Sequence, residues 1–215
     1  MPKIKSTLVS RKVLRCGVTT ERQYQTGIDI VTADVIIPIL QVLPKGLNVE
    51  VLERSLAATL ANYPLMAGQL KRDEKGFAYY IGNDVGAAFE VYRCDQATPN
   101  YGPNLDMSQH LSSYYTQIWP WHRYGKDEGI CTFRIYQFAD GGAILSISII
   151  HSLLDGSAFW QFMKDWASAA QGQPTPPRPM DRQQLIQIGQ DNIDKPYTKS
   201  YTYRPPLGQW LRIFG

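Results

Sequence analysis

The residues best suited to catalysis in this sequence lie in one short segment, His-Ser-Leu-Leu-Asp-Gly, which begins at His151. The segment follows an apolar, β-branched run at 143–150 that predicts a buried strand. Apolar residues at helical spacing follow at 157–171. A histidine between a strand and a helix lies at the rim of a sheet, within reach of a substrate. Because imidazole changes protonation near neutral pH, this side chain can accept a proton from a hydroxyl or an amine.

Further elements are predicted to hold this segment in place. The run 131–138 and the run 143–150 flank Asp140-Gly141, a dipeptide that favours a tight hairpin. Pro38 interrupts another apolar strand and therefore indicates a bulge or a sheet edge. Asn48 is suited to cap a helix that Pro64 ends, and Lys75-Gly76 predicts a turn. The remaining predicted strands are residues 6–14, 35–42, 69–72, 77–81 and 89–92, while 19–27 and 100–126 are predicted loops, the second with a short helix.

Composition excludes several classes of protein. The 215 residues are 44% hydrophobic and carry a net charge of +3, too little and too evenly spread to indicate a nucleic-acid partner. No apolar run approaches the roughly 18 residues of a membrane span, and the N-terminus lacks the apolar core of a secretory signal. The three cysteines are far apart, so no zinc site or disulfide framework is indicated. We therefore expect a cytoplasmic globular protein without a metal.

Other catalytic arrangements find little support in the residues. A Ser-His-Asp triad through Ser146, Ser148 or Ser152 lacks the G-x-S-x-G elbow that exposes a nucleophilic serine. The glycines lack the spacing and the lysine of a phosphate-binding loop. His110 and His122 have no motif around them and are interpreted as loop or surface residues. The aromatic residues around Trp119 and Trp121 are interpreted as packing rather than as a platform for a substrate.

The pattern H-x-x-x-D-G resembles the signature of the BAHD family of CoA-dependent acyltransferases, which chloramphenicol acetyltransferase and peptide-synthetase condensation domains share. The resemblance extends to "LERSLAATLANYPLMAGQL" and to "FRIYQFADGGAILSISIIHSLLDGSAFWQFMKDWASAAQG", in the family's order. It implies an α/β fold, a mixed sheet flanked by helices of the chloramphenicol-acetyltransferase-like type. It further implies transfer of an acyl group from acyl-CoA, as co-substrate, to a hydroxyl or amine of a small molecule, with no tightly bound cofactor.

The resemblance also gives each motif residue a role. His151 would be the general base. Asp155 would turn away from the substrate and pair with an arginine, for which Arg134 and Arg123 are candidates, so its role would be structural. Gly156 would allow a strand-to-helix turn in which no Cβ fits. The loop 19–34 would line the acceptor pocket, which singles out Tyr24 and Thr32.

The sequence departs from the family in length. Family members are about twice as long and carry a D-F-G-W-G motif in a second domain, and this sequence has no such motif. We therefore predict an acyltransferase N-terminal domain at 1–171 and a proline-rich crossover and tail at 172–215 that leads to an absent second domain. A homo-oligomer could also complete the site. Two alternatives stay open: a condensation-type reaction on a carrier-protein thioester, and a catalytically silent half that acts in binding or assembly.

Overall fold

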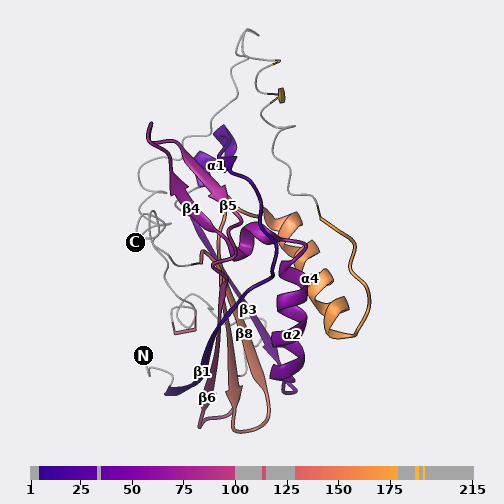
Figure 1. The fold of residues 1–215 in the computed structure, drawn as a ribbon. Helices are drawn as coiled ribbons and strands as arrows, with labels where there is room; N and C mark the ends of the chain where they lie inside the picture. Colours follow the sequence, from indigo (N-terminus) through magenta and orange to yellow (C-terminus); the bar gives the residue numbers. More distant parts are fainter. Residues whose placement is uncertain are drawn as a thin grey trace, which may run out of the picture. The chain divides into compact units, whose positions relative to one another are not determined.

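The computed structural model describes residues 5–32, 35–99, 113–114, 129–178, 187–188 and 191 (Figure 1). Contacts divide the chain into two units, Met1–Arg182 and Gln183–Gly215. In the second unit the side-chain amide of Gln187 donates to the Asp191 carboxylate at 2.7 Å, a pairing at helical spacing. All of the strands and helices that follow belong to the first unit.

A five-stranded sheet with the order β1-β6-β7-β8-β3 forms the centre of the first unit. β6 and β7 pair in parallel and the other neighbours are antiparallel, so the sheet is mixed as predicted. Every residue of β8 is buried between β7 and β3, which explains why all of its residues except Ser146 and Ser148 are apolar. β3 is an edge strand, as Pro38 indicated, because proline has no N–H to donate to a further neighbour. The strands are β1 (Ser6–Leu14), β3 (Ile36–Leu43), β6 (Ala87–Cys94), β7 (Thr132–Phe138) and β8 (Ala143–Ile150).

Two helices, α2 (Val49–Leu60) and α4 (Gly156–Ala170), lie side by side against one face of this sheet (Figure 1). The predicted cap is confirmed, because the Asn48 side-chain oxygen accepts the N–H of Val51 at 3.1 Å. Trp166 packs edge-on against Phe133 of β7 with ring centroids 5.5 Å apart. Burying each such aromatic side chain stabilises the fold by roughly 2–3 kcal/mol. No helix in the described part of the chain combines the length and apolarity needed to cross a bilayer.

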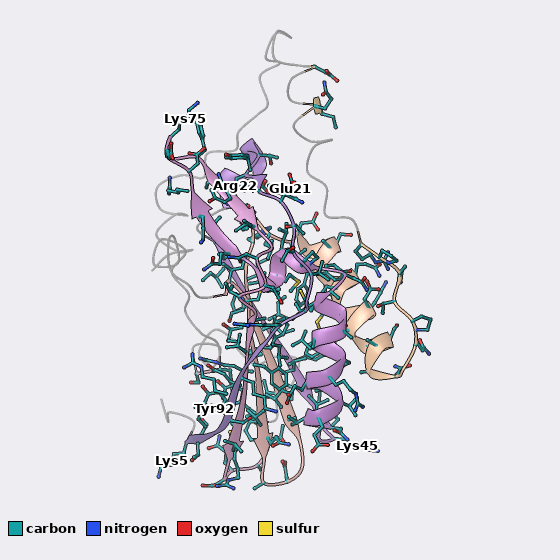
Figure 2. All side chains as sticks on the ribbon, viewed as in Figure 1. Lys5, Glu21, Arg22, Lys45, Lys75 and Tyr92 are labelled. Atoms are coloured by element: carbon teal, nitrogen blue, oxygen red, sulfur yellow. The ribbon has the colours of Figure 1, made fainter. Side chains whose placement is uncertain are left out.

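A smaller antiparallel sheet has the order β2-β5-β4. Its β4–β5 hairpin turns at the predicted position, where Gly76 has φ +86° and the Asp73 carboxylate accepts the backbone N–H groups of Lys75 and Phe77. Figure 2 shows Lys75 at the tip of this hairpin. The predicted loop at 19–27 is partly wrong, because it contains a two-residue strand too short to leave a periodic signal. The elements are β2 (Gln23–Tyr24), α1 (Gly27–Thr32), the 3-10 helix η1 (Pro64–Ala67), β4 (Gln69–Arg72) and β5 (Ala78–Ile81).

The opposite face of the large sheet carries polar and aromatic side chains. Glu90 is buried there, and its carboxylate lies 2.7 Å from Nε of Arg134 and 3.1 Å from Nε of Arg11. Tyr136 stacks on Tyr92 with centroids 4.8 Å apart, and burial raises the pKa of Tyr136 to about 12. Helices on one face and a mixed sheet beside them confirm the predicted α/β class.

Candidate active site

His151 directly follows the last residue of β8, at the strand end that the sequence predicted. Its backbone N–H donates to the carbonyl oxygen of Val35 at 2.8 Å. Val35 directly precedes β3, so the hydrogen-bond ladder between β3 and β8 continues one residue past the strands. His151 is half-buried. The residue is therefore fixed by the large sheet through its backbone and keeps part of its surface open to solvent.

The turn after His151 is attached to the smaller sheet. The N–H of Leu153 donates to the carbonyl of Ile150 at 3.0 Å, which closes the turn. Ser152 is buried, and its hydroxyl is hydrogen-bonded to the hydroxyl of Tyr80 on β5. The side-chain amide of Gln25 donates to both hydroxyls, at 3.2 Å to Tyr80 and 3.4 Å to Ser152. Sequence reasoning missed this triangle, because its three members lie far apart along the chain.

Asp155 caps helix α4 and does not form the predicted pair with Arg134. Its exposed carboxylate accepts the N–H of Ala158 at 2.8 Å. Arg134, one candidate partner, pairs with Glu90 instead, and Arg123, the other, lies outside the described residues. Within the described ranges no ion pair reaches Asp155. The physical reason is local: the first turn of a helix has unpaired N–H groups, and a short carboxylate at the cap position satisfies one of them.

Gly156 does not have the steric role that was predicted. It is the first residue of α4, its φ is not positive, and a Cβ added there would meet no heavy atom within 4 Å. The chain changes direction in the turn formed by residues 151–153 and at Asp155, whose backbone is extended with φ −78° and ψ 177°. The prediction that no Cβ would fit is therefore wrong, because the turn is completed before Gly156.

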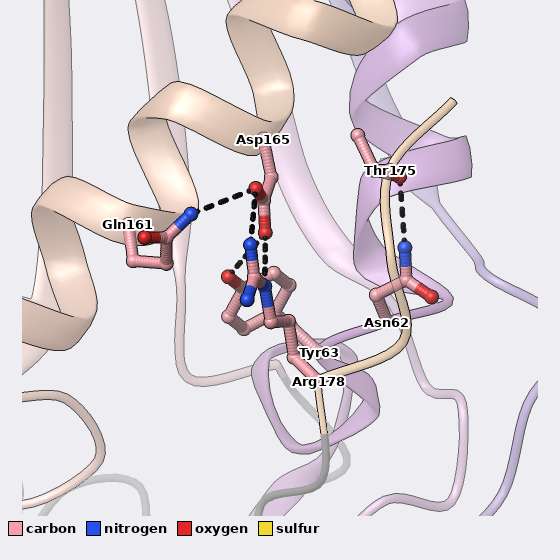
Figure 3. A network of polar contacts seen from close by, with 6 residues as sticks. All are labelled: Asn62, Tyr63, Gln161, Asp165, Thr175 and Arg178. Atoms are coloured by element: carbon pink, nitrogen blue, oxygen red, sulfur yellow. Dashed lines mark hydrogen bonds and ion pairs between the residues drawn. The ribbon is translucent and has the colours of Figure 1, made fainter. Parts of the chain in front are cut away.

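A buried carboxylate near the middle of α4 was not singled out from the sequence. Asp165 is 4% exposed and accepts hydrogen bonds from the Tyr63 hydroxyl at 2.7 Å and from the Gln161 amide at 2.9 Å (Figure 3). Arg178 donates through both Nε and Nη2, at 2.8 and 3.0 Å. The hydrogen bonds from Arg178, followed by those from Tyr63 and Gln161, outweigh burial and lower the pKa of Asp165. Gln161 and Asp165 lie four residues apart on a predicted helix, which was the only local signal.

Arg178 and Thr175 anchor the proline-rich segment that follows α4. The amide of Asn62, just after α2, donates to the Thr175 hydroxyl at 2.9 Å (Figure 3). Residues 173–178 have no regular secondary structure, as the prolines predicted, yet two side chains fix their path. The segment that follows α4 is thus held by contacts with Asn62 and Asp165 of the same unit.

Two further candidate residues, Tyr24 and Thr32, lie in the described ranges. Tyr24 donates its hydroxyl to Asp73 at 3.2 Å, and Thr32 donates to the carbonyl of Asp29 at 3.3 Å. The acceptor-pocket role of these two residues stays a prediction. His110, His122, Trp119 and Trp121 lie outside the described residues. Among the described residues, no group of three or more His, Cys, Asp or Glu is placed to hold a metal ion.

Comparison with known proteins supports the family resemblance along most of the chain. A family model described as the Transferase family matches residues 25–206. A 17,18-epoxy-17-hydroxycur-19-ene N-malonyltransferase from Strychnos nux-vomica is 31% identical over 133 residues, which are 61% of this chain and 27% of that relative. The resemblance to BAHD-type acyltransferases is confirmed at the level of the family.

Solved structures share the fold. Vinorine synthase superposes with a TM-score of 0.65 at 17% identity, over 84% of this chain and 47% of the vinorine synthase chain. F. graminearum TRI101, whose structure holds coenzyme A and T-2 mycotoxin, superposes with a TM-score of 0.56 at 15% identity, over 86% of this chain and 46% of that one. The chain thus spans less than half the length of each of these two proteins.

Proposed function

Because the chain belongs to the Transferase family, we propose that it contributes the histidine-bearing part of an acyl-transfer site that uses acyl-CoA as donor. The observation that carries the proposal is the placement of His151, half-buried at the end of a central strand and held by backbone and turn hydrogen bonds. Such a residue is accessible to a substrate and fixed by rigid elements, as a general base requires. The coenzyme A bound to TRI101, which shares the fold, supports a CoA thioester as the donor.

The proposed reaction needs one proton carrier. His151 takes the proton from the acceptor's hydroxyl or amine while its oxygen or nitrogen attacks the thioester carbonyl carbon. The tetrahedral intermediate then collapses, the carbon–sulfur bond breaks, and the CoA sulfur leaves as a thiolate that receives the proton from the imidazolium. An ester or amide and free CoA are the products, and His151 returns to its starting state. No metal or tightly bound cofactor enters this scheme.

We further propose that a second domain or a second subunit completes the site. The chain aligns with only 27% of the malonyltransferase and 47% of vinorine synthase, so much of a donor site built on that plan would come from elsewhere. The isolated 215-residue chain is therefore expected to turn over weakly or not at all as a monomer. Efficient acyl transfer by a chain shown to be monomeric by sedimentation would contradict this part of the proposal.

Replacing His151 with alanine tests the general base. The variant should be assayed in the form of the protein that transfers acyl groups, whether this chain, its oligomer or a longer protein that contains it. General base catalysis contributes about 10²–10⁴-fold in rate, so kcat should fall by that factor while KM for acyl-CoA stays nearly unchanged. His110→Ala and His122→Ala are the matched controls, because neither histidine lies in a motif. Wild-type turnover by His151→Ala would exclude the assignment.

A further inference from the structure

We infer that Ser152, Tyr80 and Gln25 are positioning residues for His151, an inference that rests on the proposed general base. The three side chains form a closed triangle of hydrogen bonds that includes Ser152, the residue after the histidine. None of the three occupies a fixed position of the H-x-x-x-D-G motif. Their proposed role is to set the backbone of the turn from which the imidazole projects.

The triangle joins the turn to an element that is itself well fixed. Tyr80 is fully buried within β5, which pairs with β4 on one side and β2 on the other. The backbone N–H of Gln25 donates to the carbonyl of Ala78 at 3.0 Å, so Gln25 is held by the same strand. Tyr80 is therefore part of the smaller sheet and Gln25 directly follows its strand β2, so these hydrogen bonds join the turn after His151 to a second sheet.

His151 is consequently fixed from two directions. The large sheet holds its N–H through the carbonyl of Val35, and the smaller sheet holds the next residue through the Ser152 hydroxyl. Ser152 is 4% exposed, so a hydroxyl there that lost its hydrogen bond with Tyr80 would rearrange its remaining contacts and shift the turn. Since a displacement on the order of 1 Å can cost about 10²-fold in rate, this second attachment bears directly on catalysis.

Tyr80→Phe is the sharpest variant, because it removes one hydroxyl and keeps the buried ring. Tyr79→Phe is its matched control, since Tyr79 is the neighbouring residue on β5, is also buried, and packs against Tyr24 and the Arg22 guanidinium rather than the triangle. Ser152→Ala removes the second hydroxyl, and Ser152→Thr restores one. Thermal unfolding of each variant verifies that it folds, so the inference does not depend on Ser152→Ala alone.

The first readout is a double-mutant cycle with His151→Ala in the acyl-transferring form of the protein. Tyr80→Phe should lower kcat about tenfold in the wild-type background while KM for acyl-CoA changes less than about twofold. Ser152→Ala should behave alike, and Ser152→Thr should recover most of the rate. In the His151→Ala background, Tyr80→Phe should cause no further loss, because the histidine that it positions is gone.

The second readout does not need activity. The chain has three histidines, so the ring Cε1–H resonance of His151 can be assigned from its loss in His151→Ala. Tyr80→Phe and Ser152→Ala should shift this resonance, and Tyr79→Phe should leave it in place. A resonance unchanged by Tyr80→Phe and Ser152→Ala would overturn the inference whether or not the isolated chain is active.

The outcomes separate the two proposals. If His151→Ala kept the wild-type rate, the proposed function would fail and the inference with it. If His151→Ala lost activity but Tyr80→Phe slowed that variant as much as it slows the wild type, the hydroxyl would act elsewhere. In that case the inference would fail and the general base would stand.

Discussion

Two aspartates, Asp155 at the N-cap of α4 and Asp165 within the helix, have very different surroundings. Asp155 is exposed, and within the described part of the chain its side chain accepts the N–H of Ala158 in the same helix turn. Asp165 is buried. It accepts hydrogen bonds from Tyr63, which directly precedes η1, from Gln161 of α4 and from Arg178 beyond the helix. The carboxylate of Asp155 accepts a backbone N–H of its own helix, whereas that of Asp165 is hydrogen-bonded to three separate parts of the chain.

The difference shows that a residue of a recognisable motif need not make more stabilising contacts than a residue outside it. Asp155 belongs to the recognisable segment, yet its contacts are those of an ordinary helix cap. Asp165 belongs to no motif, yet the path of the chain after α4 depends on it. Substitutions at the two aspartates should therefore lower the free energy of unfolding by different amounts, more at Asp165 than at Asp155.

Asp165→Ala should cause the largest loss of stability. The change removes the acceptor of the buried Tyr63 hydroxyl, and a buried donor left without its partner costs on the order of 2–3 kcal/mol. The ionic contribution of Arg178 is discounted, because one third of that side chain is exposed. Urea denaturation of the variant measures the loss. The matched control is Glu53→Ala, which removes an open ion pair with Lys12 and should cost about 0.5 kcal/mol. Equal losses in the two variants would contradict the importance given to the Asp165 network.

The Asp165 contribution should also depend on pH. Hydrogen bonds from Arg178 hold the pKa of this carboxyl below that of an unfolded aspartate, about 3.9. The stabilisation is therefore complete above the unfolded pKa and is lost as pH falls through the folded pKa. The free energies of unfolding of wild type and Asp165→Asn should differ most at neutral pH and converge in acid. A difference that stayed constant between about pH 7 and pH 2.5 would show that the charge of Asp165 is not involved.

Asp155→Ala should cost less, about 1 kcal/mol, the usual effect of losing a helix cap. Asp155→Asn distinguishes the cap from an ion pair, since asparagine caps helices as well as aspartate does but carries no charge. Thermal unfolding should find Asp155→Asn close to wild type. Equal damage by Asn and Ala would instead favour a charged partner for Asp155.

Gly156→Ala should have the smallest effect and the opposite sign. Nothing lies within 4 Å of the added methyl group and φ is not positive, so alanine should stabilise the protein by about 0.5 kcal/mol through the entropy of the unfolded chain. Gly141→Ala is the contrasting variant, because Gly141 has φ +85° in the β7–β8 hairpin and alanine should be strained there. A destabilised Gly156→Ala would restore the steric role inferred from the motif.

Local features of the fold were predictable from the sequence. The bounds of β8 agree with the apolar run at 143–150, because a strand buried on both faces is rich in apolar residues along its whole length. The helix cap at Asn48 and the turn at Gly141 were also predictable, because each depends on residues that are close in the sequence. The placement of His151 at a strand end follows from these local rules, and its catalytic role stays a proposal.

Partners that come together only through the fold were not predictable. Glu90 lies opposite Arg134 because β6 and β7 pair in parallel in one register, and nothing near either residue in the sequence encodes that register. The same holds for Asp165 with Arg178 and for Ser152 with Tyr80. The expected pair of Arg134 with Asp155 was wrong for this reason, because Arg134 lies opposite Glu90 and pairs with it.

The strand order also implies a sequence of events during folding. The β7–β8 hairpin joins neighbouring segments and can form early, whereas β3 and β1 come from the first part of the chain and must close long loops to pair. We therefore expect the edges of the sheet to dock after its centre. The Val35 carbonyl that accepts the N–H of His151 directly precedes β3, so we expect the backbone of the histidine to reach its final geometry only when β3 docks.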